Sequence, residues 1–308
     1  MIPIQLGTMN FGGRTPELEA TRVIRRALEL GVDLFDTANA YQNGDSERIL
    51  GRALGTDRSK VRIATKVGFG RTAGRPEGLS AAVVKSSITQ SLERLGTDYV
   101  DVYYLHVPDH GTPLSETLEA MAFVIEKGQA RSWAVSNYAS WQILEMLQLA
   151  PTFGLTKPVF AQQIYNPLIR QLDVEYARFA AAYEIATAIY NPLAGGLLSG
   201  KHTPGSVPKG SRFDKNPFYQ RRYLHAVMFE HVESLKEVAQ QEGMSLVDLS
   251  YAWLTHRPVV SACIVGPGSV EHLDAAHVAL QKRLSPAALA RIDELSIAYH
   301  GTDVSYAR

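Results

Sequence analysis

Short runs of β-branched and aromatic residues alternate with longer amphipathic segments along almost the whole chain. The short runs predict strands at residues 4–6, 33–36, 61–66, 99–106, 130–136, 159–162, 185–190 and 262–265. Helices are predicted between them, at residues 17–30, 46–54, 81–95, 114–127, 141–149 and 173–183. Eight such units close a parallel barrel, so we expect an α/β fold of the (β/α)8 TIM-barrel type. An open doubly wound sheet is the alternative, and it is disfavoured because no phosphate-binding fingerprint follows the first strand.

The repeat is interrupted after Tyr190 by a long segment that is rich in Gly, Pro, Lys and Arg and runs to about Arg222 before helices resume. A loop of this length in a compact domain usually serves function. Two more helices are predicted at 270–280 and 286–296, followed by a polar tail. We expect residues 1–308 to form one barrel domain, because the chain is 45% apolar and no linker divides it.

Composition limits the partners of this chain. The 31 basic and 31 acidic residues balance, so no electrostatic surface for nucleic acid or an anionic membrane is indicated. The single cysteine, Cys263, lies in an apolar run, excludes an intramolecular disulfide and fits a reducing compartment. The chain has neither a basic leader nor an apolar stretch of membrane-spanning length. We therefore expect a cytoplasmic protein that acts on a small molecule, with no metal site.

Polar residues stand at the ends of three successive predicted strands. Asp36 ends DLFD, Lys66 ends IATK and His106 ends VYYLH, while Tyr41 follows Asp36 by five residues. Each has an ordinary structural explanation when taken alone: a helix cap, a solvated strand end, an interior histidine and a surface aromatic residue. Because the C-terminal ends of barrel strands converge on one mouth, the four side chains together predict a catalytic pocket.

Their chemistry suits carbonyl reduction. A hydride delivered to a carbonyl carbon leaves an alkoxide, which Tyr41 would protonate. Lys66 is expected to lower the pKa of Tyr41 by favouring the phenolate, and Asp36 is expected to hold Lys66 charged and in place. A neutral His106 could donate a hydrogen bond to the carbonyl oxygen and orient the substrate.

Several motifs resemble the aldo-keto reductase superfamily, in order and across nearly the whole chain. They are GVDLFDTANAY, ERILGRAL, IATKVG, LERLGTDYVDVYYLH, AVSNY and YNPLAGGLLSGK. More narrowly, YLHVPDHGTPLSETL, SNYASW and the C-terminal residues Tyr306 to Arg308 resemble the aflatoxin-aldehyde and succinic-semialdehyde reductases. The resemblance implies an NADP(H)-dependent oxidoreductase that reduces aldehydes and ketones.

The resemblance also implies a cofactor site that contains no Rossmann domain. Its residues would be Ser136, Asn137, Gln162, Tyr190, Asn191, Pro192, Leu193, Gly195, Leu197, Ser199, Lys201, Arg212, Gly266, Gly268 and His272. The first three would bind the nicotinamide carboxamide, Tyr190 would stack on the ring, and the loop from Asn191 would wrap the pyrophosphate. The sequence departs from the family at Gly268 and Ala276, where a basic residue and an asparagine are common, and at His272. NADPH is nevertheless expected over NADH, because the helix N-terminus near Val270 favours an anion.

For the substrate, the resemblance implies Met9, Tyr41, His106, Tyr219, Arg222 and Arg308, and the two arginines would suit a carboxylate. The glycine-rich segment 68–74 is interpreted as a substrate-side loop, since its spacing is GxGxxxG. Two alternatives stay open: a nicotinamide-binding regulatory subunit of a potassium channel, and a sugar or sugar-phosphate dehydrogenase. The resembling branch contains homodimers, so a homodimer is one expected form.

Overall fold

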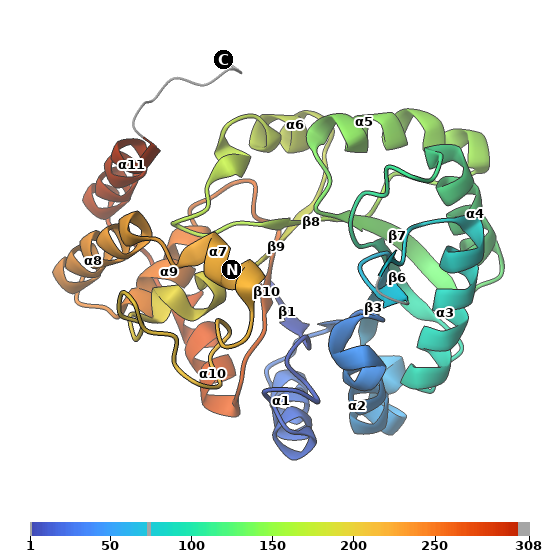
Figure 1. The fold of residues 1–308 in the computed structure, drawn as a ribbon, viewed down its shortest axis with the longest axis horizontal. Helices are drawn as coiled ribbons and strands as arrows, with labels where there is room; N and C mark the ends of the chain where they lie inside the picture. Colours follow the sequence, from blue (N-terminus) through green and yellow to red (C-terminus); the bar gives the residue numbers. More distant parts are fainter. Residues whose placement is uncertain (1, 73–74, 301–308) are drawn as a thin grey trace.

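Eight parallel strands close into a barrel in the computed structural model, which describes residues 2–72 and 75–300. The strands are β1 (Ile4–Gly7), β2 (Leu34–Asp36), β3 (Arg62–Val67), β6 (Val100–Leu105), β7 (Ala130–Ser136), β8 (Ala161–Ile164), β9 (Thr187–Tyr190) and β10 (Ala262–Val265). Neighbours around the ring follow the order β1-β10-β9-β8-β7-β6-β3-β2, and β1 pairs with both β2 and β10. The predicted (β/α)8 barrel is therefore confirmed (Figure 1).

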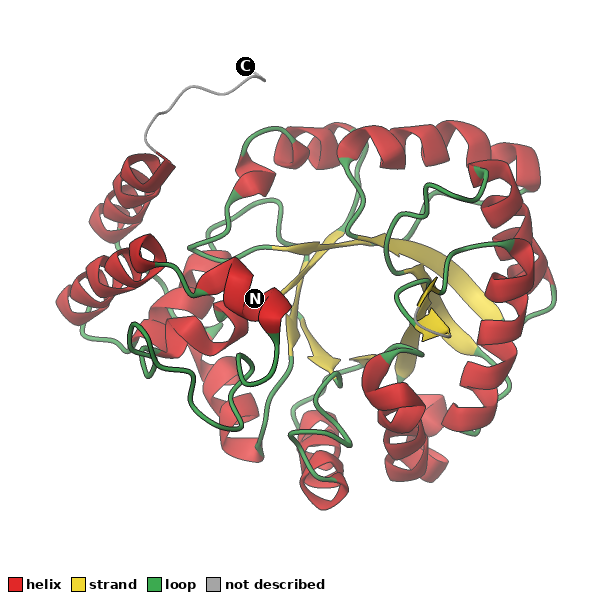
Figure 2. Cartoon of the chain, viewed as in Figure 1, coloured by secondary structure: helices red, strands yellow, loops and turns green. Residues whose placement is uncertain are grey.

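Helices surround the ring of strands, as Figure 2 shows. They are α1 (Glu17–Glu29), α2 (Asp45–Leu54), α3 (Ala81–Leu95), α4 (Leu114–Glu126), α5 (Ser140–Leu149), α6 (Tyr176–Ala182), α7 (Pro217–Tyr223), α8 (Ala226–Gln241), α9 (Leu246–Leu254), α10 (Val270–Ala279) and α11 (Pro286–His300). Gly96 and Gly128 follow α3 and α4 with φ of 64° and 71°, the left-handed conformation that ends a helix at low cost for glycine. None of the described helices combines the length and apolarity that a bilayer span needs.

The main apolar core lies between the strands and these helices, and two smaller clusters fill the barrel interior. The interior residues include Leu34, Ala64, Tyr104, Ala134, Phe160 and Ala188. Side chains of a strand alternate between its two faces, so a residue two positions further on points to the same side. Two positions after these six residues stand Asp36, Lys66, His106, Ser136, Gln162 and Tyr190. The barrel interior thus delivers six of the predicted site residues to one end.

Two local features differ from the sequence-based expectation. The loop after β3 contains a short antiparallel pair, β4 (Arg71–Thr72) and β5 (Arg75–Pro76). The segment expected to be irregular up to Arg222 already becomes helical at Pro217, where Asn216 caps α7 by accepting from the Tyr219 amide at 3.2 Å. The cap and Pro217 at the first turn explain the early start.

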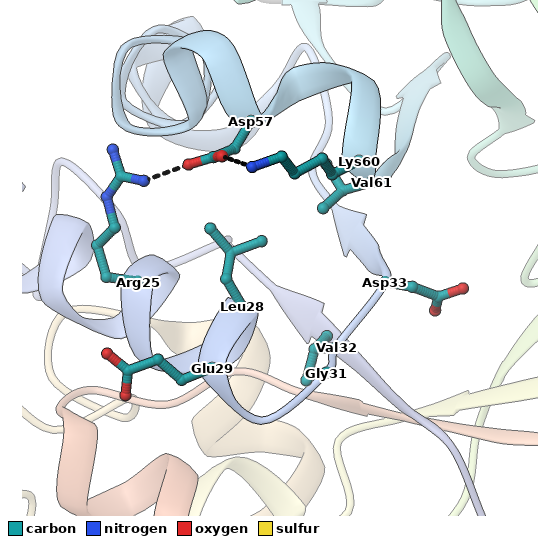
Figure 3. A pocket seen from close by; sticks show the side chains of 9 residues that line it. All are labelled: Arg25, Leu28, Glu29, Gly31, Val32, Asp33, Asp57, Lys60 and Val61. Carbon is teal, nitrogen blue, oxygen red and sulfur yellow. Dashed lines mark hydrogen bonds and ion pairs between the residues drawn. The ribbon is translucent and has the colours of Figure 1, made fainter.

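A hollow of about 450 Å³ opens at the opposite end of the barrel (Figure 3). It is lined by α1 and by residues that immediately precede β2 and β3, such as Val32 and Val61. Asp57 bridges Arg25 and Lys60 across it, at 2.5 and 2.8 Å. Because barrel enzymes place their chemistry at the C-terminal ends of the strands, this hollow belongs to the stabilising end.

Candidate active site

Asp36 and Lys66 form a buried ion pair at the C-terminal end of the barrel. The Lys66 Nζ lies 2.5 Å from Asp36 Oδ1, and the two residues are 0% and 2% exposed. The ammonium also donates to the Thr37 carbonyl at 2.8 Å and to the Tyr41 hydroxyl at 3.4 Å. Burial lowers the pKa of Lys66, and the adjacent Asp36 carboxylate opposes that change. All three ammonium protons therefore have an acceptor, and one of the acceptors is the phenol oxygen.

Gln162 completes the coordination of Asp36 from the opposite side of the barrel. Its side-chain amide donates to Asp36 Oδ2 at 2.8 Å, so both carboxylate oxygens have a partner. Gln162 was expected to bind the nicotinamide carboxamide. The structure places it at the predicted centre but directs its amide group to Asp36.

Tyr41 begins the short helix η1 (Tyr41–Gly44) on the loop after β2, and its ring is half-buried. The lowered pKa expected for Tyr41 is wrong. Burial raises the pKa of Tyr41 well above its usual value, and the Asp36 carboxylate raises it further. The Lys66 ammonium nevertheless donates a hydrogen bond to the phenol oxygen. Tyr41 thus keeps its proton at neutral pH, with a cation 3.4 Å from the oxygen that would become charged.

His106 is buried beside this pair. Its imidazole Nδ1 has no hydrogen-bond partner among the described residues, and its ring lies edge-on to Tyr41 with centroids 5.8 Å apart. Burial and the positive charge of Lys66 hold the pKa of His106 well below its usual range. The imidazole is therefore neutral, as the predicted role in binding a carbonyl oxygen requires.

Ser136, Asn137 and Tyr190 are joined by hydrogen bonds at the ends of β7 and β9, which lie on either side of β8. Asn137 has a φ of 65°, and its side-chain amide donates to the His106 carbonyl and to Ser136 Oγ, both at 3.0 Å. Its Oδ1 accepts from the Tyr190 hydroxyl at 2.6 Å. Asparagine tolerates this left-handed conformation better than most residues. Three of the four residues expected at the nicotinamide thus lie together beside His106.

The loop after β9 turns back on itself through the short helix η5 (Ala194–Ser199). Asn191 Oδ1 accepts from the Gly195 amide at 2.8 Å, and Asn191 Nδ2 donates to the Tyr223 hydroxyl at 2.8 Å. Gly195 has a φ of 69°, and a Cβ there would lie 2.8 Å from the Tyr219 ring. Only glycine fits this turn, which suits the close backbone approach expected for a dinucleotide. Pro192 and Leu197 are buried in the loop, Leu193 and Ser199 are half-buried, and Lys201 is exposed at its end.

Arg212, Met9 and Tyr219 meet near the mouth. The Arg212 guanidinium lies 3.2 Å from the Met9 sulfur and 5.4 Å from the Tyr219 ring centre, and Arg222 lies 5.8 Å from the same ring. Sequence analysis missed Arg14, whose pKa burial and the Arg212 charge lower to about 10. None of these three arginines forms an ion pair with an acidic residue of the described chain. Arg308 lies outside the described residues.

The expected adenosine end differs from the catalytic end. The Gly266 carbonyl accepts from Asn10 at 3.4 Å, and Ser269 caps α10 by accepting from the exposed His272 amide at 3.4 Å. The Val270 amide, expected to favour an anion, donates instead to the Glu19 carboxylate of α1 at 3.3 Å. Gly268 offers no side chain to this site, and Ala276 is buried in α10. Glu19 was missed because it is 251 residues distant in sequence.

Known proteins resemble the chain over most of its length. Residues 3–297 match the model of the Aldo/keto reductase family. The chain is 35% identical over 264 residues to a probable voltage-gated potassium channel subunit beta of Arabidopsis thaliana, covering 84% of this chain and 80% of the relative. It is 33% identical over 314 residues to aflatoxin B1 aldehyde reductase member 2 of Homo sapiens, covering 96% and 86%.

The rat aflatoxin B1 aldehyde reductase member 2 is also 33% identical, over 288 residues that cover 87% of this chain and 77% of the relative. Proteins of this family act on small carbonyl compounds with a nicotinamide cofactor. The barrel and these similarities agree, and the chain is a member of the aldo/keto reductase family of NAD(P)-dependent oxidoreductases.

Proposed function

We propose that this protein reduces aldehydes and ketones to alcohols with NADPH and that Tyr41 donates the proton. The observation that carries the proposal is the chain of contacts from Asp36 through Lys66 to the Tyr41 hydroxyl. The nicotinamide, when bound, supplies the hydride. His106 would hold the carbonyl oxygen near the phenol, and Lys66 would stabilise the phenolate as its proton leaves. Replacement of the proton from solvent would return the site to its starting state.

Different residues around the centre would bind different parts of the dinucleotide. Ser136, Asn137, Gln162 and Tyr190 would orient the nicotinamide, and the glycine turn after Asn191 would lie along the phosphates. The preference for NADPH rests on the family resemblance and on the cations Arg212 and Arg14. Glu19 acts against it at the adenosine end. We also propose that the chain works as a single barrel domain in the cytoplasm, as a homodimer.

For the substrate, we propose short semialdehydes or dialdehydes, including those that carry a carboxylate. Arg222 supports this because its guanidinium lies 4.4 Å from the Phe218 ring centre and 5.8 Å from that of Tyr219, and it forms no ion pair with an acid among the described residues. Arginine pairs with a carboxylate through two parallel hydrogen bonds, which would favour succinic semialdehyde over an uncharged aldehyde of the same length. Met9 and, by resemblance, Arg308 would complete this side of the site.

The test is the Tyr41→Phe variant, because it removes only the hydroxyl. We expect kcat for succinic semialdehyde to fall at least about 100-fold. The dissociation constants of NADPH and NADH, measured by fluorescence quenching, should change less than about twofold, since the ring remains. The wild-type panel should include an uncharged aldehyde and a sugar, so that a sugar dehydrogenase would show itself. Full activity of Tyr41→Phe would refute its role as donor.

A second candidate is a nicotinamide-binding regulatory subunit, and the 35% identity to a probable potassium channel subunit beta favours it. Both candidates use the same pocket, so binding of the dinucleotide does not separate them. Turnover does: a subunit would retain the nicotinamide tightly and reduce no aldehyde of the panel at a measurable rate. Multiple turnovers with succinic semialdehyde would exclude this candidate as the main role.

A further inference from the structure

We propose that Phe69, fixed by Glu77, is a specificity-determining wall of the substrate site that selects carbonyl compounds bearing a flat apolar or aromatic group. The inference rests on the proposed function, because the selected group would lie next to the carbonyl bound at His106. Neither residue belongs to the four-residue centre. Both lie on the loop between β3 and α3.

Phe69 stands over the catalytic histidine while most of its surface faces solvent. Its ring centroid is 5.0 Å from that of His106, with the planes tilted by 38°, and the residue is 56% exposed. A large apolar side chain left in water is common on a protein surface. Here it covers a buried, neutral imidazole at the reaction centre, so its exposed face borders the position where a bound carbonyl would carry its substituent.

The position of Phe69 is set from both sides by one carboxylate. Gly68 and Gly70 flank Phe69 in the chain. Glu77 Oε2 accepts from the Gly68 amide at 2.9 Å and from the Gly70 amide at 3.1 Å. Gly68 has a φ of 106°, and a Cβ there would lie 2.6 Å from the Leu79 side chain. An ionised carboxylate is an acceptor only, and charge strengthens such hydrogen bonds. Glu77 therefore fixes the backbone on both sides of Phe69 and so restricts the conformations of this loop.

Glu77 also ties this loop to the catalytic one. Its Oε1 accepts from the Asn39 side-chain amide at 2.7 Å and from the Ser87 hydroxyl at 2.9 Å. Asn39 lies two residues before Tyr41, and its backbone amide donates to the Lys66 carbonyl at 3.2 Å. The four hydrogen bonds give both oxygens of the Glu77 carboxylate two donors each. Glu77 is thus a positioning residue that fixes the Phe69 wall relative to the loop that carries the proton donor Tyr41.

The geometry indicates which substituents of a carbonyl compound would gain binding free energy from Phe69. A flat apolar group attached to the carbonyl carbon could lie against the exposed face of the Phe69 ring, and aromatic pairs gain free energy beyond the area they bury. A short aliphatic aldehyde reaches little of that ring. The wall should therefore change the relative kcat/KM of two aldehydes rather than the chemistry itself.

The experiment compares benzaldehyde with propanal in wild type, Phe69→Ala and Phe69→Leu. Phe69→Ala should lower the benzaldehyde-to-propanal ratio of kcat/KM about 5- to 20-fold, mainly through KM for benzaldehyde. Phe69→Leu, which is apolar but not flat, should fall between. Glu77→Gln keeps the shape but loses acceptors, so it should shift the ratio in the same direction by a smaller factor. Phe123→Ala, which truncates an exposed aromatic residue on α4, is the matched control and should not change the ratio.

The outcomes separate this inference from the function on which it rests. If wild type reduces both aldehydes and Phe69→Ala leaves the ratio unchanged, the wall is refuted and the reductase stands. If wild type reduces neither aldehyde, both proposals fall. Equal changes of the ratio in Phe69→Ala and Phe123→Ala would show a general loss of packing and would also refute the wall. A thermal midpoint for each variant within a few degrees of wild type confirms that the comparison is between folded proteins.

Discussion

The catalytic end and the adenosine end of the expected cofactor channel are built differently. At the catalytic end, Asp36, Lys66 and Gln162 are each at most 3% exposed, and their polar atoms already bind one another. At the adenosine end, His272 is exposed, Gly268 has no side chain and the Val270 amide binds an acid, Glu19. The polar groups of the first end are thus oriented by the fold itself, whereas those of the second end lie at the surface, where we expect the choice of dinucleotide to be made.

The difference follows from where the residues sit. Barrel strands pass through a packed interior, so a side chain at their C-terminal ends inherits a fixed direction. The residues of the adenosine end lie on loops and on a helix N-terminus, where solvent competes for every contact. Mutations at the first end should therefore act on rate and stability together, and mutations at the second should act on binding alone. The predictions below test this contrast.

The largest effect is expected at Lys66. Lys66→Met keeps the length of the side chain but leaves the Asp36 charge buried without its cation. Breaking a buried pair in this way costs about 3–5 kcal/mol of stability. Turnover should fall at least about 100-fold, because the phenolate of Tyr41 loses its stabilising contact. Urea unfolding and steady-state kinetics measure the two losses separately.

A double variant distinguishes the causes. Asp36→Asn combined with Lys66→Met removes both charges, so most of the stability should return, while turnover stays low. If turnover returned together with stability, Lys66 would act only as a structural residue. If neither loss appeared in Lys66→Met, the preparation of the catalytic end argued above would be wrong.

The sequence could predict for a physical reason that these side chains converge at one end of the barrel. The alternation of strands and helices indicates the barrel, and strand-end positions such as Asp36, Lys66 and His106 then share one mouth. The pKa of Tyr41 could not be predicted, because its direction depends on burial and on how fully Asp36 neutralises Lys66. The same limit applies to Glu19, Phe69 and Glu77, whose roles arise from contacts between separate loops. Local patterns do not record such contacts.

An intermediate effect is expected at Glu19. The 2′-phosphate of NADPH would meet this carboxylate if it occupies the N-terminus of α10 as the family resemblance implies. Glu19→Gln removes the negative charge and should tighten NADPH binding about 2- to 10-fold, with little change for NADH, since a charge at a helix N-terminus acts with about 0.3–2 kcal/mol. Fluorescence titration of both dinucleotides measures the ratio.

Glu17→Gln provides the control. Glu17 lies in the same first turn of α1 and pairs with Arg52 at 2.7 Å, as Glu19 pairs with Arg22 at 3.5 Å, but of the two it is Glu19 that accepts from the Val270 amide. It should leave the ratio of the two dissociation constants at the wild-type value. An unchanged ratio in Glu19→Gln would place the 2′-phosphate elsewhere, and the contrast between the two ends would then rest on Gly268 and His272 alone.

The smallest effect concerns pH. Because burial and Lys66 hold the pKa of His106 well below its ordinary value of about 6.5, the folded protein leaves this imidazole neutral where the unfolded chain protonates it. The unfolded state then binds more protons, so the free energy of unfolding should fall as pH drops below about 6.5, by at most about 1.4 kcal/mol per pH unit from this group.

His106→Gln should flatten the dependence of the free energy of unfolding on pH between pH 6.5 and 5, and kcat of the wild type should show no step near pH 6.5. His202→Gln is the comparison, since burial lowers the pKa of His202 less strongly. An unchanged slope in His106→Gln would mean that this histidine titrates as a surface residue does, and the catalytic end would not be as closed to solvent as its packing indicates.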